Sequence, residues 1–444
     1  MNAVDPRDPP PRSGALRERG FRLYWSALSI SLVGDEITFL AIPLAAVLLL
    51  DAGPTEMGWL TAAALLPSLL LSIPGGAWAD RQANRRRAMI VADLGRFAAV
   101  VSVPLAYAFD ALTMTHLYVT EFTVGAFTVL FRVCKHHVYA SVLAEDRYVE
   151  GNALLTGSRS VAEVAGPGTG GALVQALTAP VALLLDAVTY LASAVCLRRI
   201  EATEAPPARH EGGGLTAGLR WVTANRTPGL LIAGVATLSL FSTLWATLFV
   251  LYATDELGLS PALLGLVYAM FGLGGLTGAY LAPRVVRRIG IGPAVIVGFV
   301  GFSSPMLLLP LADGSTLVVV TVLAVSQFGS GCGVAVQDIA ANSYLIAVIP
   351  PTLRSRVMGV IQTSNFGVRP VGAVLAGTLG AAIGLRPTMW IGTAGAVLSV
   401  LWVLASGLRH VEDLPMHGTP GAPDAAETPR APDVPDAPAK TAAG

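Results

Sequence analysis

Long apolar stretches, separated by short polar breaks, make up the chain from about residue 21 to residue 409. A helix needs roughly 20 consecutive apolar residues to cross the hydrocarbon core of a bilayer, and this region holds about twelve such stretches. The pattern predicts an all-α membrane protein with twelve transmembrane helices at residues 21–50, 57–79, 88–109, 113–143, 150–177, 179–199, 228–253, 261–283, 290–311, 315–347, 355–383 and 387–408.

The segments outside these stretches are polar. Residues 215–226 place Leu215, Leu219 and Val222 on one helical face and polar residues on another, which predicts an amphipathic helix at the membrane interface. Both ends of the chain have too few large apolar residues to fold. We therefore expect a disordered tail at 1–20, a six-helix bundle at 21–200, a linker at 201–227, a second six-helix bundle at 228–409 and a disordered tail at 410–444.

Basic residues are sorted to alternate breaks between the stretches. The breaks after the second, fourth, sixth, eighth and tenth stretches carry arginines. Those after the first, third, fifth, seventh and ninth carry no Lys or Arg, but carry Asp51, Glu56, Asp110, Asp255, Glu256 and Asp313. Cytoplasmic loops of membrane proteins are enriched in Lys and Arg. The charges therefore predict a multi-pass protein of the cell membrane with both termini in the cytoplasm.

Composition agrees with this interpretation, because 53% of the residues are apolar and 13% are charged, whereas a soluble domain carries about 25% charged residues. The formal net charge of zero says nothing about partners, because the charges are sorted by loop. We expect no nucleic-acid partner. Cys134, Cys196 and Cys332 lack the spacing of a disulfide framework or a zinc site. The sequence has no H-E-x-x-H, G-x-S-x-G or G-K-[ST] motif, so we expect neither an enzyme nor an ATPase.

An arginine-rich motif follows the second stretch, at residues 75–87, GGAWADRQANRRR, and residues 92–96, ADLGR, come shortly after it. The spacing of Gly76, Asp80 and the arginines resembles the cytoplasmic loop between helices 2 and 3 of the major facilitator superfamily. In that family the loop recurs, in degraded form, between helices 8 and 9. Residues 278–288, GAYLAPRVVRR, supply the second copy here.

The resemblance implies two pseudo-symmetric six-helix bundles that rock about a central cavity, an architecture built from parallel repeats. It also implies that Asp80 latches a cytoplasmic gate, within a gating set of Gly76, Asp80, Arg81, Arg85, Arg86, Asp93 and Arg96. The motif departs from the family at Ala83 and Asn84, and its second copy has Ala282 in place of the aspartate. The alternative is that these arginines only set the topology.

A glycine-rich motif lies in the fifth stretch, with residues 166–171 reading GPGTGG. It resembles the antiporter signature G-P-x-x-G-G of drug exporters in the same superfamily, at Gly157, Gly166, Pro167, Gly170 and Gly171. Small residues let helices approach closely, and ordinary helix packing is the alternative interpretation. The same letters contain G-x-G-x-x-G, but a dinucleotide site requires a preceding strand, which we do not expect here. Pro370 in the eleventh stretch matches Pro167 as a second kinking proline.

Ionisable residues inside the apolar stretches are the candidate chemistry, because each costs at least ~2.5 kcal/mol at the bilayer centre. A carboxyl group that alternates between an apolar environment and an arginine neighbour can bind and release a proton near neutral pH. The proton-coupling candidates are, in order, Asp35, Glu36, Glu121 and Glu163. The alternative for each is a static structural pair, which is the favoured interpretation for Asp186. The candidates for the cavity or substrate site are Arg132, Lys135, Arg159, Gln337, Asp338, Asn342 and Arg369.

Spacing groups several of these residues. Glu121, Arg132 and Lys135 follow a heptad-like interval in the fourth stretch, so we expect them to face one cavity. Arg159 and Glu163 are four residues apart and are expected to pair on one helical face. Lys135 and the two histidines after it would favour an anionic or carboxylate-bearing cargo.

Residues 92–96, ADLGR, and residues 158–167, SRSVAEVAGP, make the chain similar to the enterobactin-exporter and macrolide-efflux branch of the superfamily. The resemblance implies a secondary active transporter that exports small amphipathic molecules, such as a drug, a siderophore or a secondary metabolite, in exchange for protons. We expect a monomer whose partners are the bilayer, the cargo and protons, with no metal or cofactor and the proton gradient as its energy source. The alternatives are a proton-coupled uptake carrier of the same fold and, with less support, a non-transporting membrane protein.

Overall fold

The computed structural model describes residues 14–82, 84–201 and 215–411, and the side chains of Ile73, Ala77, Asp80 and Leu215 lie outside the described part. Within these ranges the chain is helical and contains no strand. The α-helices are α1 (Arg19–Leu50), α2 (Pro54–Arg81), α3 (Arg85–Ala108), α4 (Met114–Val142), α5 (Tyr148–Leu177), α6 (Ala179–Arg198), α7 (Leu215–Ala224), α8 (Arg226–Leu251), α9 (Pro261–Ile289), α10 (Ile291–Met306), α11 (Thr316–Val348), α12 (Arg354–Ile383) and α13 (Leu385–Ala405). A π-helical turn, η3 (Tyr252–Glu256), extends α8.

The helices follow the apolar stretches closely, with differences at two places. Helix α10 ends at Met306, directly after Pro305, so residues 307–311 form turns instead of the last turn of the expected helix. The first tail is shorter than expected, because α1 begins at Arg19 and a 3-10 turn precedes it. Ala15 is buried there, and its backbone N–H donates a 2.9 Å hydrogen bond to Glu150 at the start of α5. The amphipathic segment expected after residue 215 is helix α7.

In the part of the chain that the structure describes, nine helices are long and apolar enough to cross a membrane: α1, α3, α4, α6, α8 with η3, α9, α11, α12 and α13. Helix α10 is apolar but has only 16 residues. Helices α2 and α5 are 28 and 30 residues long and fall outside that set. These observations establish an all-helical membrane protein.

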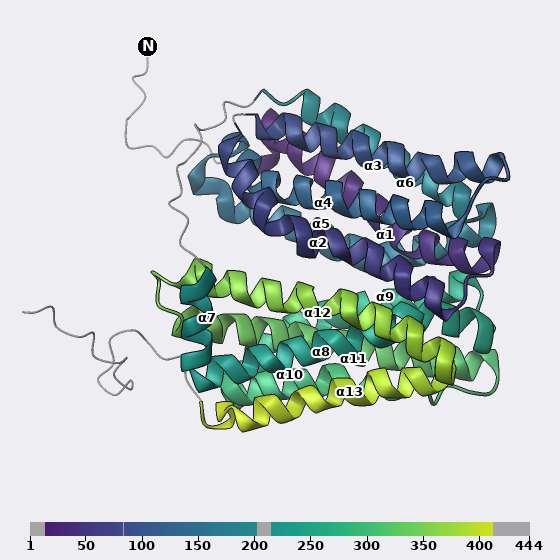
Figure 1. Ribbon diagram of the computed structural model, residues 1–444. Coiled ribbons are helices and arrows are strands. Elements are labelled where there is room, and N and C mark those ends of the chain that lie inside the picture. The colour runs from purple at the N-terminus through teal and green to yellow at the C-terminus, as the bar shows by residue number, and fades with distance from the viewer. Residues whose placement is uncertain (1–13, 83, 202–214, 412–444) are drawn as a thin grey trace, which may run out of the picture.

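The helices form two groups, which we call the N-terminal group, α1–α6, and the C-terminal group, α7–α13 (Figure 1). The groups touch mainly along two helix pairs, α2 with α12 and α5 with α9. Near α7 the two groups stand apart, and at the opposite end of the molecule they pack against each other (Figure 1). The α2–α12 and α5–α9 pairs thus each join one helix of the N-terminal group to one helix of the C-terminal group.

Glycines allow both helix pairs to approach closely where the groups meet. A Cβ atom added to Gly171 of α5 would lie 2.3 Å from the carbonyl oxygen of Pro261 and 3.0 Å from the Cα of Gly265, both in α9. A Cβ atom added to Gly58 of α2 would lie 2.8 Å from the Cα of Gly377 in α12. The two groups are thus closed against each other by backbone-to-backbone contact, which only small residues permit.

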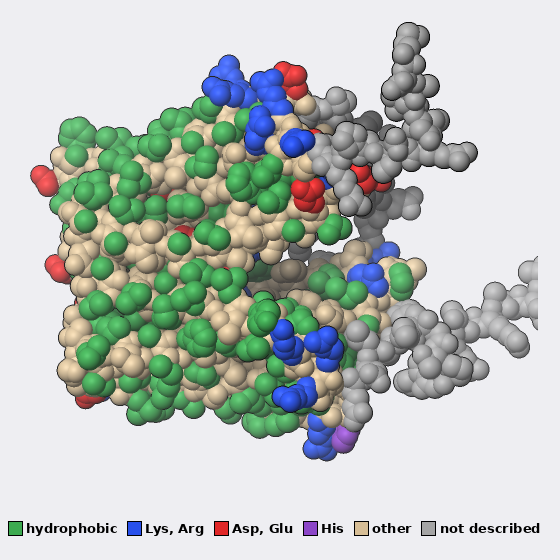
Figure 2. Space-filling view, turned by 180° about the vertical axis from the view of Figure 1, so that it is seen from behind, with side chains coloured by type: hydrophobic (Ala, Val, Ile, Leu, Met, Phe, Trp, Pro, Cys, Tyr) green, Lys and Arg blue, Asp and Glu red, His purple; other side chains and the backbone are tan. Residues whose placement is uncertain are grey.

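The two ends of the molecule differ in charge. The acidic end, where the glycine contacts lie, carries Asp51, Glu56, Asp110, Asp255, Glu256 and Asp313. The basic end carries Arg81, Arg85, Arg86, Arg87, Arg198, Arg199, Arg284, Arg287, Arg288, Arg354 and Arg356. Figure 2 shows that the surface is hollowed between the two groups and that the hollow opens toward the basic end. The sides of the molecule expose many large apolar side chains, as expected of a surface that faces lipid.

Candidate functional site

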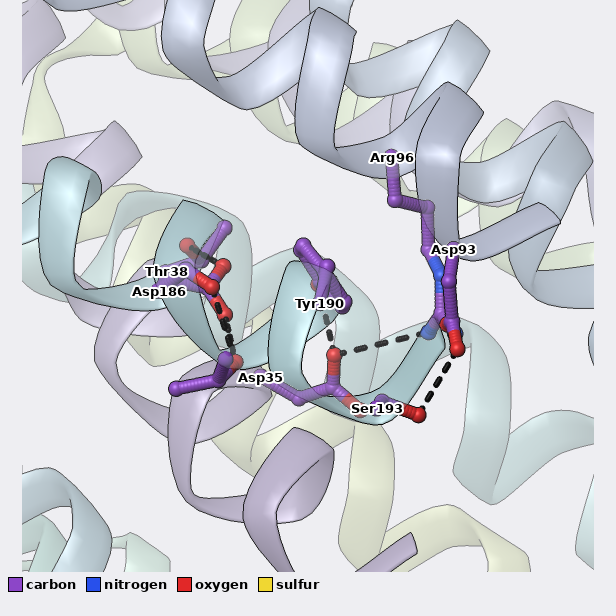
Figure 3. Close-up of polar contacts among 8 residues, drawn as sticks. Asp35, Thr38, Asp93, Arg96, Asp186, Tyr190 and Ser193 are labelled. Atoms are coloured by element: carbon purple, nitrogen blue, oxygen red, sulfur yellow. Dashed lines mark hydrogen bonds and ion pairs between the residues drawn. The ribbon is translucent and has the colours of Figure 1, made fainter. Parts of the chain in front are cut away.

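A polar network lies inside the N-terminal group, between α1, α3 and α6 (Figure 3). Arg96 of α3 is at its centre and forms ion pairs with Asp93, one turn earlier, and with Asp35 of α1, the second with an Nη1–Oδ1 distance of 3.7 Å. Ser193 of α6 donates a 2.7 Å hydrogen bond to Asp93, and the hydroxyl of Tyr190 donates a 2.6 Å hydrogen bond to Asp35. Three helices therefore hold one guanidinium group between two carboxyl groups.

Asp35 is the member of this network that solvent reaches. Its side chain is 39% exposed, whereas those of Asp93 and Arg96 are 0% and 2% exposed. The guanidinium of Arg96 also lies 4.4 Å from the ring centre of Tyr190 and 4.6 Å from that of Phe131. Aromatic faces attract cations, so these rings help to keep the charge of Arg96 inside the group. Asp35 thus lies between the buried guanidinium group of Arg96 and solvent.

A third carboxyl group, that of Asp186 on α6, is fully buried beside this network. Thr38 of α1 donates a hydrogen bond to its Oδ2 atom, and the Thr189 hydroxyl lies 3.0 Å from its Oδ1 atom. Gly34 provides the space, because a Cβ atom added there would lie 2.0 Å from Oδ1. In residues 14–82, 84–201 and 215–411 no Lys, Arg or His forms an ion pair with Asp186. Hydroxyl groups therefore hold this carboxyl group.

The gating set implied by the resemblance is divided in the structure. Asp93 and Arg96 belong to the interior network, because both side chains point from α3 toward α1 and α6. The side chain of Asp80 lies outside the described residues. Arg85 is 3% exposed, and its Nε donates a 3.0 Å hydrogen bond to the carbonyl oxygen of Ala79, which satisfies a backbone group at the end of α2.

The other members of that set lie at the basic end. Arg81 is exposed at the last residue of α2, and Arg86 is half-buried in the first turn of α3. A Cβ atom added to Gly76 would meet no described atom within 4 Å. Gly76 therefore lies in open space here, unlike the tightly packed glycines of the acidic end.

Arg159 and Glu163 form the ion pair that their spacing predicts, with an Nε–Oε1 distance of 2.7 Å. Their side chains are 68% and 45% exposed, so the pair is solvated. Glu36 of α1 is half-buried and close enough to interact electrostatically with both. Its side chain packs on Gly166, where an added Cβ atom would lie 2.4 Å from the Glu36 Cβ. The glycine motif of α5 therefore accommodates a proton-coupling candidate of α1.

The face of α4 that carries Glu121, Arg132 and Lys135 borders α2. Gly125, one turn after Glu121, packs against α2, since an added Cβ atom would lie 2.9 Å from the carbonyl oxygen of Ala64. Arg132 also reaches α2, where its Nη2 atom lies 3.4 Å from the Ser72 hydroxyl. The half-buried Glu121 has no hydrogen bond or ion pair to any described residue. The helix that packs against this face, α2, cannot be identified from the spacing alone.

The candidates on α11 point in different directions. Gln337 is 4% exposed and packs against Gly298 of α10, inside its own group, so it does not line a space between the groups. Asp338 and Asn342 are exposed. Asp338 is close enough to Arg369 of α12 for an electrostatic interaction. Adjacent residues of a helix differ by about 100° in direction, so only one of Gln337 and Asp338 can face a given neighbour.

The glycine motif of α5 contacts two helices. Gly170 packs on the backbone of α1, with an added Cβ atom 3.3 Å from the Cα of Ile37, and Gly171 packs on α9. The carbonyl oxygen of Pro167 would lie 2.3 Å from a Cβ atom at Gly265. A Cβ atom at Gly157 would meet nothing within 4 Å in the described part of the chain. The motif is therefore a close helix crossing at the acidic end.

The crossing of α5 with α9 has a counterpart in the crossing of α2 with α12, where the contact is displaced along the helix. The carbonyl oxygen of Ala373 in α12 lies 2.9 Å from the position of a Cβ atom on Gly58. Ala373, one turn after Pro370, thus makes the contact in this pair that Pro167 makes in the other, since each carbonyl oxygen packs against a glycine of the other group. Each of the two helices contains a proline, Pro167 in α5 and Pro370 in α12.

The sequence pattern alone did not single out Thr38, Tyr190 and Ser193. A signal was present, because Asp186, Tyr190 and Ser193 recur at intervals of four and three in an apolar stretch and so share one helical face. Among the residues that the structure describes, no group of three or more His, Cys, Asp or Glu side chains is arranged to hold a metal ion.

Comparisons with known proteins agree with this architecture. The "Multidrug efflux pump Tap" of Mycobacterium tuberculosis is 27% identical over 385 residues, which cover 82% of this chain and 87% of the relative. The crystal structure of a bacterial homologue of the iron transporter ferroportin in an inward-facing state aligns with a TM-score of 0.71 and 17% identity, covering 89% of this chain and 99% of that chain. The outward-facing state of a bacterial ferroportin homologue aligns with a TM-score of 0.56 and 15% identity, covering 87% and 98%.

The profile of a family described as transmembrane secretion effectors, MFS_3, matches residues 13–426, which is most of the chain. This match confirms the resemblance to the major facilitator superfamily and the expectation that the chain is a transporter and not an enzyme. The protein belongs to the transmembrane secretion effector family of the major facilitator superfamily.

Proposed function

We propose that this protein exports small amphipathic molecules in exchange for protons by alternating access. The observation that carries the proposal is the network in the N-terminal group, where one guanidinium group pairs with the carboxyl groups of Asp35 and Asp93, a third carboxyl group lies beside them on Asp186, and the side chain of Asp35 is partly exposed. The relatives named multidrug efflux pumps support the direction of transport and the breadth of cargo.

The charges of the network support proton binding. Asp35, Asp93 and Asp186 carry three carboxyl groups, but Arg96 supplies the one guanidinium among them. Burying an ionised group without an opposite charge is expensive, so ionising all three at once is disfavoured. Neighbouring carboxyl groups titrate as a unit and share protons. Asp35 is the point of exchange in this proposal, because it is the exposed member.

The arrangement of the two groups supports alternating access. They meet at the acidic end through Gly171 and Gly58 and leave a hollow that opens at the basic end. Because arginines favour the cytoplasmic side, the basic end would face the cytoplasm, with both termini on that side. The higher TM-score to the inward-facing than to the outward-facing ferroportin homologue, 0.71 against 0.56, is consistent with an inward-open state.

The domain division follows the same reasoning. In this proposal α2, α5 and α10 also cross the membrane, which gives six spans in residues 21–200 and six in residues 228–409, joined by the linker at 201–227. The protein acts as a monomer in the cell membrane. Each bundle would rotate as a unit, while the contacts of the acidic end open and those of the basic end close.

In the transport cycle, an inward-open protein releases its proton from Asp35 to the cytoplasm and binds cargo. After the switch it releases cargo outside and takes up a proton there. The Asp35–Arg96 ion pair, at 3.7 Å, is the interaction that proton binding would weaken. A proton that crosses a potential of 100 mV gains ~2.3 kcal/mol, which is enough to accumulate an uncharged cargo about fifty-fold.

The test uses purified protein in proteoliposomes that contain the pH indicator pyranine, with N-phenyl-1-naphthylamine (NPN) as an uncharged amphipathic probe. We expect NPN to accelerate the collapse of an imposed pH gradient severalfold with the parent protein, and the Asp35→Asn variant to lose this acceleration. Asp313→Asn is the matched control, because that carboxylate is 84% exposed at the acidic end. An Asp35→Asn variant that keeps the full acceleration would refute the role of Asp35.

A further inference from the structure

The ring of Phe366, in the middle of α12, lies near two guanidinium groups, one from each of the two helix groups. The Cζ of Arg132 in α4 lies 5.4 Å from the ring centre, and the Cζ of Arg369 in α12 lies 5.5 Å from it. Arg132 belongs to the N-terminal group, whereas Phe366 and Arg369 belong to the C-terminal group. The three side chains are half-buried and span the space between the groups.

No carboxylate within the described part of the chain lies within 4 Å of either guanidinium. Arg132 has one side-chain hydrogen-bond partner, the hydroxyl of Ser72 at 3.4 Å. Arg369 interacts electrostatically with Asp338 at longer range. A guanidinium group has five N–H donors, so most donors of these two groups have no partner among the described residues.

A third cation adds to this charge. Lys135 lies one turn after Arg132 on α4, is half-buried, and its ammonium has no hydrogen bond or ion pair with a described residue. It is close enough to Arg159 and Arg132 to interact with both electrostatically, and the charge of Arg159 is offset by Glu163. Asp338 offsets one of the three positive charges, so the local balance is positive. A half-buried positive region of this kind is a favourable place for a negatively charged group of a ligand.

We propose that Arg132, Phe366 and Arg369 form a recognition site for amphipathic anions that carry an aromatic ring. Guanidinium groups bind carboxylate and sulfonate groups through paired N–H donors, while Phe366 offers a face for an aromatic ring. This proposal deepens the transport function proposed above and rests on it, since it names the class of cargo for the same inter-group space.

The position of the site between the groups gives it a role in release. Arg132 moves with one group, and Phe366 and Arg369 move with the other. A rocking motion of the two groups would therefore separate the donors, and the site would be complete only in the state seen here. A ligand that binds one state better stabilises that state, and its affinity falls when the site comes apart. An anion would thus bind from the basic end and be released after the switch.

The experiment compares two fluorescent probes with related aromatic skeletons. 8-Anilino-1-naphthalenesulfonate (ANS) carries a sulfonate, and NPN lacks it. Equilibrium binding is measured to the full-length protein in nanodiscs without any gradient, and empty nanodiscs give the background. We expect Arg132→Gln and Arg369→Gln each to weaken ANS binding about tenfold or more, because charge-assisted hydrogen bonds are lost, with NPN binding changed less than twofold.

The matched control is Arg284→Gln. Arg284 lies near the end of α9, 4.1 Å from the ring centre of Tyr280, so it is also an arginine over an aromatic ring, but it is exposed at the basic end outside the proposed site. We expect it to bind both probes like the parent. Arg132→Lys keeps a positive charge, so it should recover part of the ANS affinity, and size-exclusion profiles check that each variant folds.

Three results would overturn the anion site: no ANS binding by the parent above background, equal losses of ANS and NPN binding in the arginine variants, or an equal loss of ANS binding in Arg284→Gln. None of these affects the transport proposal, which depends on NPN-driven proton movement. Conversely, selective loss of ANS binding in a protein that moves no protons would support the anion site and refute proton coupling.

Discussion

The glycine crossing between α5 and α9 gives the sharpest test of the architecture, through the substitution Gly171→Ala. The added Cβ atom would lie 2.3 Å from the carbonyl oxygen of Pro261 and 3.0 Å from the Cα of Gly265. These are backbone atoms, so no side-chain rotation can relieve the overlap, and α5 must move away from α9. Overpacking of this kind costs about 1–3 kcal/mol.

This cost applies to the conformation in which the acidic ends touch, so the substitution should shift the protein toward the alternative, in which they separate. An energy of about 1–3 kcal/mol corresponds to a change of roughly 5- to 150-fold in the ratio of the two states. Gly157→Ala is the control on the same helix, since its Cβ atom would meet nothing within 4 Å among the described residues.

The assay is a spin-label distance measurement across the acidic end, in a background without Cys134, Cys196 and Cys332. One label replaces Phe109, which is 79% exposed at the end of α3, and the other replaces Leu317, which is 77% exposed at the start of α11. We expect a longer distance to grow in the Gly171→Ala distribution. If that distribution matches the parent, or if Gly157→Ala lengthens it equally, the crossing does not close the acidic end.

Two further predictions follow from single contacts. Gly34→Ala should reduce NPN-driven proton movement at least tenfold, because its Cβ atom would lie 2.0 Å from the Asp186 carboxyl group. Gly20→Ala on the same helix is the control and should retain this activity, because the atom nearest to its Cβ would lie 3.5 Å away. Equal activities of the two variants would argue against a role for the Asp186 carboxyl group. Arg386→Ala should lower the thermal unfolding temperature by at most about 2 °C. Its carboxylate partners lie at 3.5 and 3.9 Å, its hydrogen bond to the carbonyl oxygen of Ala312 is 3.3 Å long, and exposed ion pairs contribute below about 1 kcal/mol. A larger drop would show that these contacts stabilise the fold more than surface contacts do.

Most helix positions could be predicted from the sequence because most of the helices are long and apolar and are separated by polar breaks. The pairing of Arg159 with Glu163 could also be predicted, because it depends only on residues four apart on one helix. Such local features need no knowledge of neighbouring helices. The sorting of arginines to alternate breaks can likewise be read directly from the amino-acid sequence.

Contacts between helices could not be predicted in the same way. Asp93 and Arg96 follow a motif that resembles a cytoplasmic gate, yet the rotation of α3 turns them toward Asp35 and α6. The sequence favours a structural role for Asp186, but it does not show that Gly34 of α1 leaves the space in which its carboxyl group is buried. The rotation of a helix about its axis depends on its partners, and one sequence contains no direct record of them.

The glycine motif of α5 connects the two parts of the proposed mechanism. Gly166 and Gly170 pack against α1, where Glu36 and Asp35 lie, and Gly171 packs against α9 at the contact that closes the acidic end. A change in the charge of the α1 carboxyl groups that shifts α1 must therefore be accommodated by the same helix that closes this end. Coupling needs a packed element that two sites both bias, and α5 is in contact with both. A motif without any charged side chain can thus transmit the effect of a proton, because its small residues leave two helices no room to move independently.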